Sequence, residues 1–408
     1  MTGTVRAQLS IMMFLEFFIW GSWFVTMGIY LPNSLGSDGG EIAMAYSTQS
    51  WGAILAPFII GLIADRYFNA ERILGILHLS GAVLMYLLYR ADNFDLFFPY
   101  LLVYMVGYMS TLALVNSVSF NQMEDPGKEF PFVRVFGTVG WITAGILISF
   151  MDWDSQLGIS EGFLRNTFLM AAISSGVLGV FSFTLPKTPP RADVSKKVRL
   201  SDVLGLDALS LLKDRNFLIF FLASVLICIP LAFYYQHAGQ FLGEIGVANP
   251  AFKMTFGQVS EILFMLLLPY FFKRFGFKMT LLVAMAAWGI RYLLFAYGDT
   301  GELVFLLLIG IALHGICYDF FFVSGQIYTD SKAGQAYKSS AQGLITLATY
   351  GLGMLIGFWV AGKITDAYLL SYGIHDWQTI WMYPAAFAVV VLILFAALFK
   401  NIKIDYRA

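Results

Sequence analysis

Long apolar segments recur along this chain, and they constrain its fold more than any other feature. Each is close to the length of about 20 residues that a helix needs to cross the hydrocarbon core of a bilayer. Only 12% of the 408 residues are charged, against about 25% in soluble domains. The sequence therefore predicts an all-α integral membrane protein with twelve transmembrane helices, near residues 9–31, 45–64, 72–90, 95–118, 131–152, 165–185, 217–243, 255–272, 279–297, 302–326, 339–362 and 378–399.

The longest polar segment runs from Pro186 to Asn216 and separates six apolar segments from six. This arrangement predicts an N-terminal six-helix half at 1–185, a linker at 186–216 and a C-terminal six-helix half at 217–408. Lys and Arg favour the cytoplasmic side of a membrane protein. Most of the 25 in this chain fall on one side when the N-terminus is cytoplasmic, so both termini and the linker are predicted to be cytoplasmic. The basic residues of the linker either bind anionic lipids or form an ordinary solvated loop.

Several classes of protein are disfavoured by the composition and motifs. A net charge of −1 provides no basic face for nucleic acid. Cys228 and Cys317 both lie inside apolar segments, which indicates small core residues rather than a disulfide or a metal pair. The HExxH and Walker patterns are absent, and no set of nucleophile and base or of metal ligands stands out, which argues against a membrane enzyme and an ATP-driven pump. We therefore expect no metal or cofactor, and a monomer surrounded by membrane lipids.

A few charged residues interrupt the apolar segments. Placing one at the centre of a bilayer costs about 2.5–3.5 kcal/mol on insertion scales, so such residues usually face a water-filled cavity or a partner. There they bind a solute, a proton or an ion. Gln258 lies three residues before Glu261, which puts both on one helix face. As a set these residues indicate a transport pathway: Glu16, Arg134, Glu261, Arg291 and Asp319.

Most of these charged residues also have a structural interpretation. Glu261 is either a substrate or proton site or a structural pair for Arg291 or Arg134. Asp319 is either a coupling carboxylate or a structural partner for a buried base. Arg134 either lines the pathway or extends its side chain to the interface, whereas Arg291 is interpreted as structural.

The remaining polar candidates are less determined by the sequence. Glu16 stays open between the two roles. His78 is interpreted as an interfacial or loop residue. His314 lies four residues before Tyr318, on the same side of its helix, and either lines the cavity or packs.

The segment from Gly61 to Arg72, GLIADRYFNAER, stands between the second and third predicted spans. It resembles the loop signature of the major facilitator superfamily, in which this loop latches the two halves together on the cytoplasmic side. The resemblance implies that fold, and a gating role for Gly61, Asp65, Arg66 and Arg72. The alternative is an ordinary polar turn.

Further motifs extend over nearly the whole chain: FFIWGSW at 17–23, RVFGTVGW at 134–141, GLDAL at 205–209, QVSE at 258–261, YDFFFVSG at 318–325, SAQG at 340–343 and DWQ at 376–378. Together they resemble the bacterial nucleoside:proton symporter family. The resemblance implies a proton-coupled secondary transporter that imports nucleosides across the bacterial inner membrane by alternating access. The alternative cargo is a sugar or another small polar metabolite.

The resemblance also implies a central nucleoside cavity lined by both halves. Arg134, Thr138 and Trp141 match substrate positions in the fifth span, and their spacing places them on one helix face. Gln258 and Glu261 match the polar pair of the eighth span. Aromatic rings can stack on a base, and amide or carboxylate groups can bond its edge or the ribose hydroxyls.

The seventh and tenth spans depart from the family pattern. In the tenth, His314 and Tyr318 occupy positions where the family has aromatic residues, and Asp319 matches an acidic position. In the seventh, Tyr235 and Gln236 stand where the family has amide side chains. Burial penalises the charged form of a carboxylate, so Glu261 and Asp319 are predicted to couple transport to protons, the expected coupling ion.

Overall fold

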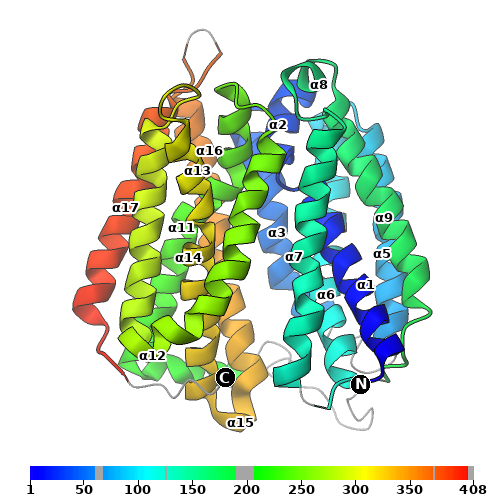
Figure 1. Cartoon of the computed structure of the whole chain (residues 1–408), viewed down its shortest axis with the longest axis vertical. Coiled ribbons are helices and arrows are strands. Elements are labelled where there is room, and N and C mark those ends of the chain that lie inside the picture. The colour runs from blue at the N-terminus through cyan, green and yellow to red at the C-terminus, as the bar shows by residue number, and fades with distance from the viewer. Residues whose placement is uncertain (60–67, 125, 190–205, 371–372, 403–408) are drawn as a thin grey trace. The chain divides into compact units, whose positions relative to one another are not determined.

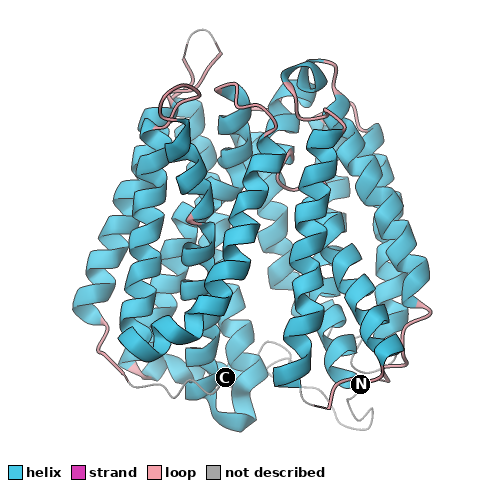
Figure 2. Ribbon diagram, viewed as in Figure 1, coloured by secondary structure: helices cyan, strands magenta, loops and turns pink. Residues whose placement is uncertain are grey.

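The computed structural model of the protein describes residues 1–59, 68–124, 126–189, 206–370 and 373–402. Helices make up nearly all of this part of the chain (Figure 2). Within it, the β-contact is an isolated antiparallel bridge between Leu369 and His375. The predicted all-α class is confirmed. Backbone polar groups in lipid must be paired internally, and a helix satisfies them within its own segment.

The helices form two compact units (Figure 1). The N-terminal unit comprises Met1–Ser37 and Met44–Val203, and the C-terminal unit comprises Asp38–Ala43 and Leu204–Ala408. The bounds that the sequence predicts for two halves and a linker stay a prediction.

The N-terminal unit contains α1 (Gly3–Gly21), α2 (Met27–Tyr30), the π-helix η1 (Leu31–Leu35), most of α3 (Gly39–Ile59), α5 (Ala70–Arg90), α6 (Phe94–Asn121), α7 (Pro126–Phe150), α8 (Gln156–Ser160), η3 (Phe163–Arg165) and α9 (Asn166–Ser182). The C-terminal unit contains η4 (Leu206–Lys213), α11 (Arg215–Glu244), α12 (Pro250–Tyr297), α13 (Val304–Ala312), α14 (His314–Tyr318), η5 (Asp319–Val323), α15 (Ser324–Thr346), η6 (Leu347–Gly353), α16 (Met354–Ala367) and α17 (Trp377–Leu398).

Nine helical stretches in the described part of the chain are long and apolar enough to cross a membrane. They cover ten of the twelve predicted segments, because α12 contains two of them joined across a kink at Gly276. The predicted segments 9–31 and 45–64 also lie on helices. The first is interrupted by a turn at 22–26, and the second continues past Ile59 into residues outside the described ranges. The chain is therefore a multi-pass membrane protein, and twelve spans are consistent with this arrangement.

Glycines let α1 and α7 approach closely in the N-terminal unit. A Cβ added at Gly140 would lie 2.2 Å from the Phe14 carbonyl oxygen, and one added at Gly21 would lie 3.0 Å from the Cα of Trp141. Small residues at such positions are the usual way in which membrane helices pack. The close approach brings the aromatic face of α1 against Trp141.

In the C-terminal unit, α14 packs equally closely on α12. A Cβ added at Gly315 would lie 2.5 Å from the Ser260 carbonyl group, and the Gly315 N–H donates to Ser260 Oγ at 2.9 Å. Since His314 and Glu261 are the sequence neighbours of these two residues, this contact places them beside one another.

Candidate substrate and proton site

Asp319 is the least satisfied carboxylate in the described part of the C-terminal unit. It is 0% exposed, and neither of its oxygens has a hydrogen-bond partner among the described residues. It lies close enough to Glu261 for the two carboxyl groups to repel one another electrostatically. A buried polar group without a partner costs about 1–3 kcal/mol, and more when it is charged. Proteins retain such a group mainly where a ligand or a proton completes it.

Arg291 provides a buried positive charge in the same unit. Its guanidinium carbon lies 3.3 Å from the centroid of the Tyr234 ring, a cation–π contact, and its Nη1 lies 3.4 Å from His314 Nδ1. The side chain is 0% exposed, and Nε and Nη2 have no hydrogen-bond partner among the described residues. The sequence interpretation of Arg291 as structural therefore omits its direct contact with His314.

The tautomer of His314 follows from its contact with Arg291. A guanidinium can only donate hydrogen bonds, so His314 Nδ1 accepts and the ring proton lies on Nε2. That nitrogen faces Glu261, with Nε2 and Oε2 3.9 Å apart. His314 is thus a neutral ring that presents an N–H toward the Glu261 carboxylate. It is 4% exposed and stacks on Tyr234, with ring centroids 5.5 Å apart.

Two π-helical turns border this cluster. Asp319 begins η5, and η6 contains Tyr350. Tyr318 directly precedes η5, and its hydroxyl group lies 2.6 Å from that of Tyr350, which connects the start of η5 to η6. Isolated π-turns inside α-helices occur frequently at functional sites. Tyr350 was not predicted as a site residue, and its only sequence signal is a tyrosine among the glycines of an apolar span.

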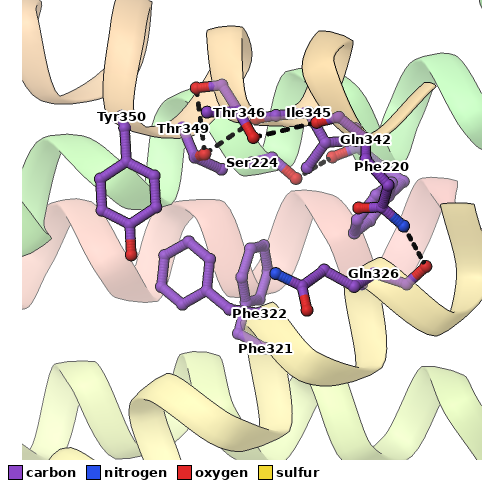
Figure 3. Close-up of a pocket in the computed structure, with 11 residues that line it drawn as sticks. Phe220, Ser224, Phe321, Phe322, Gln326, Gln342, Ile345, Thr346, Thr349 and Tyr350 are labelled. Atoms are coloured by element: carbon purple, nitrogen blue, oxygen red, sulfur yellow. Dashed lines mark hydrogen bonds between the residues drawn. The ribbon is translucent and has the colours of Figure 1, made fainter. Parts of the chain in front are cut away.

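Beside Tyr350 the C-terminal unit encloses a small pocket, which Figure 3 shows in close-up. The Phe322 and Tyr350 rings stack at 6.0 Å along its wall, and Gln342 donates to the Gln326 carbonyl at 2.9 Å. The pocket holds about 30 Å³, which is room for water and not for a nucleoside. Its other lining residues are Phe220, Ser224, Phe321, Gly325, Ile345, Thr346 and Thr349.

The predicted residues of α11 lie partly in this cluster. Tyr235 lies close enough to Tyr318 and Glu261 to interact with both electrostatically. Gln236 is 0% exposed, and both polar atoms of its amide lack a partner among the described residues. Gln258 is half-buried, and its Oε1 atom also lacks one. The sequence did not single out Tyr234, the residue that stacks between Arg291 and His314.

Arg134, Thr138 and Trp141 lie on α7 in the N-terminal unit, and all three are half-buried. The Arg134 guanidinium stands over the Phe17 ring at 4.0 Å. Trp141 packs edge-on against Trp20 at 5.5 Å. This side of α7 is therefore an aromatic surface with one positive charge.

Two further sequence interpretations have different outcomes. His78 was interpreted as an interfacial or loop residue, and this is wrong. It lies within α5 at 2% exposure, and its Nε2 is 2.8 Å from Glu16 Oε2. Of the predicted gating residues, Gly61, Asp65 and Arg66 lie outside the described residues, and Arg72 is exposed in the first turn of α5.

Comparison with known proteins decides the family. A family model described as nucleoside H⁺ symporter matches residues 3–403. The chain belongs to this family. The "Putative nucleoside transporter YegT" of Escherichia coli K12 is 42% identical, over 98% of this chain and 97% of the relative. The xanthosine permease of the same strain is 34% identical over 99% of each chain, and its nucleoside permease NupG is 31% identical over 97% of this chain and 96% of NupG.

Structural similarity leads to the same family. Two crystal structures of the nucleoside transporter NupG match with TM-scores of 0.89 (a mutant) and 0.86, at 32% identity and over 97% of this chain. The two matches cover 100% and 99% of the respective NupG chains. A sucrose permease of Escherichia coli is 23% identical over 69% of this chain and 68% of its own. The protein is thus a transporter of the major facilitator fold and not an enzyme.

Proposed function

We propose that this protein imports nucleosides together with protons by alternating access. The observation that carries the proposal is a group of polar atoms near Glu261 that have no partner among the described residues, namely both oxygens of Asp319 and two nitrogens of Arg291. Leaving such a group without a partner is unfavourable in free energy, and a polar ligand or a proton that binds there removes much of this cost. Family membership supplies the class of cargo.

The residues around this group suit a nucleoside. A nucleoside is neutral, with an aromatic face and an edge of donors and acceptors. Tyr235, His314 and Tyr318 supply rings that can stack on a base, and Gln236 and Gln258 supply amides with unpartnered atoms. Sites that bind small molecules combine apolar walls with a few polar groups that fix orientation in this way. Arg134, Thr138 and Trp141 of the N-terminal unit are proposed as additional substrate contacts.

Proton coupling is proposed to involve Glu261 and Asp319 together. Two carboxylates close to each other, one buried and one half-buried, disfavour being ionised at the same time, so one proton shared between them relieves the repulsion. The neutral His314 presents an N–H to Glu261, which favours the ionised form of that residue and leaves the proton to Asp319. Arg291 balances the remaining negative charge.

The placement in the membrane is also a proposal. The excess of Lys and Arg on one side supports cytoplasmic termini, and the family supports the bacterial inner membrane. The loop residues Gly61, Asp65, Arg66 and Arg72 are proposed to gate the cytoplasmic side.

The decisive experiment is uptake of radiolabelled uridine into proteoliposomes under an inward proton gradient. Glu261→Gln removes the titratable group but keeps the shape, so it should abolish gradient-driven accumulation. Glu302→Gln, an exposed glutamate of the same unit, is the matched control and should transport normally. Unchanged accumulation by Glu261→Gln would contradict the coupling role.

The second candidate cargo is a sugar, which the similarity to a sucrose permease favours. Competition separates the two possibilities in the same assay. Unlabelled adenosine should suppress uridine uptake, whereas ribose and hexoses should leave it unchanged. Uptake of a labelled disaccharide with no uridine uptake would replace the nucleoside by a sugar.

A further inference from the structure

The N-terminal unit contains a buried titratable pair that takes no part in the function proposed above. Glu16 on α1 and His78 on α5 are 0% and 2% exposed, and their Oε2 and Nε2 atoms lie 2.8 Å apart. The Thr111 hydroxyl on α6 lies 2.6 Å from the other carboxylate oxygen, Oε1, and 2.6 Å from the Tyr108 carbonyl oxygen, so its single hydrogen is shared between these two acceptors. Ser175 on α9 lies 3.3 Å from the second ring nitrogen, Nδ1. Four helices therefore meet at one hydrogen-bonded pair.

The hydrogen bonds around His78 determine how many protons the pair holds. Ser175 donates its single hydroxyl hydrogen to the His78 carbonyl at 2.9 Å, so toward Nδ1 it can only accept. His78 Nδ1 therefore carries a hydrogen. The short contact between Nε2 and Glu16 needs a second hydrogen, because two acceptors would repel at 2.8 Å. A neutral imidazole and a carboxylate together hold only one, so the pair contains one additional proton.

This additional proton makes the pair electrically neutral. It lies either on His78, giving an imidazolium beside a carboxylate, or on Glu16, giving an imidazole beside a carboxylic acid. Both arrangements have zero net charge, which suits a site that is excluded from solvent. Release of the proton would leave one uncompensated negative charge among four helices, and a buried unpaired charge is strongly unfavourable.

The titratable and charged groups near the pair come from two neighbouring helices. On α6, Tyr104 and Tyr108 lie close enough to Glu16 to interact with it electrostatically. On α7, Arg134 interacts with Tyr108 in the same way. The sequence of α9 contains no titratable residue. In the described part of the unit these groups supply no second carboxylate, so the pair itself is the group that can exchange a proton.

Aromatic contacts connect the pair to a predicted substrate residue. Tyr108 donates its hydroxyl hydrogen to the Glu16 carbonyl at 2.6 Å. Its ring packs edge-on against Trp20 at 5.7 Å, and Trp20 packs against Trp141 at 5.5 Å. We propose that Glu16 and His78 form a second proton-binding site, separate from Glu261 and Asp319. Its proton keeps the rings of Tyr108, Trp20 and Trp141 in place for transport.

The test counts protons on the purified full-length protein. When the protein is taken from neutral to alkaline buffer in an indicator-dye titration, wild type should release one more proton than Glu16→Gln. Gln keeps the hydrogen bonds but cannot titrate. Glu71→Gln is the matched control, since Glu71 is a second buried glutamate of the same unit that accepts from the Thr188 N–H at 2.9 Å and has no histidine partner in the described part of the chain. Its proton count should equal that of wild type.

A second variant and a transport assay complete the test. In His78→Gln the buried carboxyl group of Glu16 remains, so this variant should still release one more proton than Glu16→Gln. Equilibrium exchange of uridine, with the same pH on both sides of the vesicle, should decline in alkaline buffer for wild type and persist for Glu16→Gln. This readout alone rests on the proposed function. Absence of all uridine exchange would contradict the nucleoside proposal while leaving the proton count valid.

Two results would overturn the inference. Equal proton release by wild type and Glu16→Gln would show that the pair holds no exchangeable proton. An alkaline decline of the same size in both proteins would show that the proton does not support transport.

Discussion

The two units treat buried charge in opposite ways. In the N-terminal unit, Glu16 and His78 are almost fully enclosed, and each is hydrogen-bonded on both sides. In the C-terminal unit, Asp319 and Arg291 are just as deeply buried, but most of their polar atoms lack partners among the described residues. The hydrogen-bonded pair of the N-terminal unit holds its helices together, whereas the polar atoms of Asp319 and Arg291 are available to bind a ligand or a proton.

This difference indicates that the buried pair of the N-terminal unit stabilises the fold, whereas the buried group of the C-terminal unit serves activity. A fully satisfied buried network is strongly destabilised by the loss of one member. A group that is already unsatisfied loses little when it is neutralised, although its function disappears. Proteins commonly accept such unfavourable groups where activity needs them.

The largest expected effect comes from breaking the satisfied pair. Glu16→Ala leaves His78 and Thr111 without their partner, and the loss of one member of a buried pair costs about 3–5 kcal/mol. Asp319→Asn replaces a buried carboxyl group that has no partner among the described residues by a neutral amide, so it should leave the thermal midpoint unchanged or raise it. Thermal unfolding of both variants in the same detergent measures the contrast. Equal losses of stability would mean that the two units do not differ as described.

An intermediate effect is expected from the cation that borders the unsatisfied cluster. Arg291→Gln removes the cation–π contact with Tyr234 and the donor to His314, and hydrogen bonds to charged groups contribute about 1.5–3 kcal/mol. Nucleoside affinity should fall by about tenfold or more, measured by calorimetric binding. Arg291→Lys keeps the charge without the planar stacking group, so its nucleoside affinity should lie between those of wild type and Arg291→Gln. If both variants bind nucleoside as tightly as wild type, Arg291 has only a structural role.

The smallest expected effect concerns an ion pair at the ends of two membrane-spanning stretches, where Asp214 precedes α11 and Lys332 is close to the end of the stretch Val304–Ala333. Lys332 lies 2.8 Å from Asp214, and this hydrogen bond holds the pKa of the Asp214 carboxyl below its usual value of 3.8. A lowered pKa stabilises the fold above pH 3.8, and that stabilisation is lost as pH falls through the lower folded value. Because both side chains are partly exposed, the contribution is about 1 kcal/mol or less. In Asp214→Asn the free energy of unfolding should fall less steeply than in wild type as pH is lowered through this range. The same acid dependence in both proteins would show that the ion pair contributes nothing to stability.

The sequence predicted the fold well because apolar length and charge asymmetry are local signals. Within the described residues each predicted span lies mostly on helix, and the family follows from motifs that extend over the chain. The interruption near Ser22–Thr26 was missed, because hydropathy does not register a turn inside an apolar segment.

The site was predicted less completely, because its decisive features depend on tertiary contacts. The unusual charges, Glu261 and Asp319, stand out in the sequence. By contrast, Tyr234 and Tyr350 resemble any other aromatic residue of an apolar span until α11 and η6 place them beside His314 and Tyr318. His78 was misinterpreted because its partner, Glu16, lies 62 residues away along the chain.

Gly276 has a consequence for how the protein is synthesised. It has φ +78°, a conformation that L side chains rarely adopt, and it is the single non-helical residue inside α12. Lys273, Arg274 and Lys278 surround it, and basic residues resist translocation across the membrane. We therefore expect the two apolar segments that it joins to enter the bilayer together as one hairpin. A nascent chain halted just after this glycine would expose an apolar helix that still lacks its packing partner.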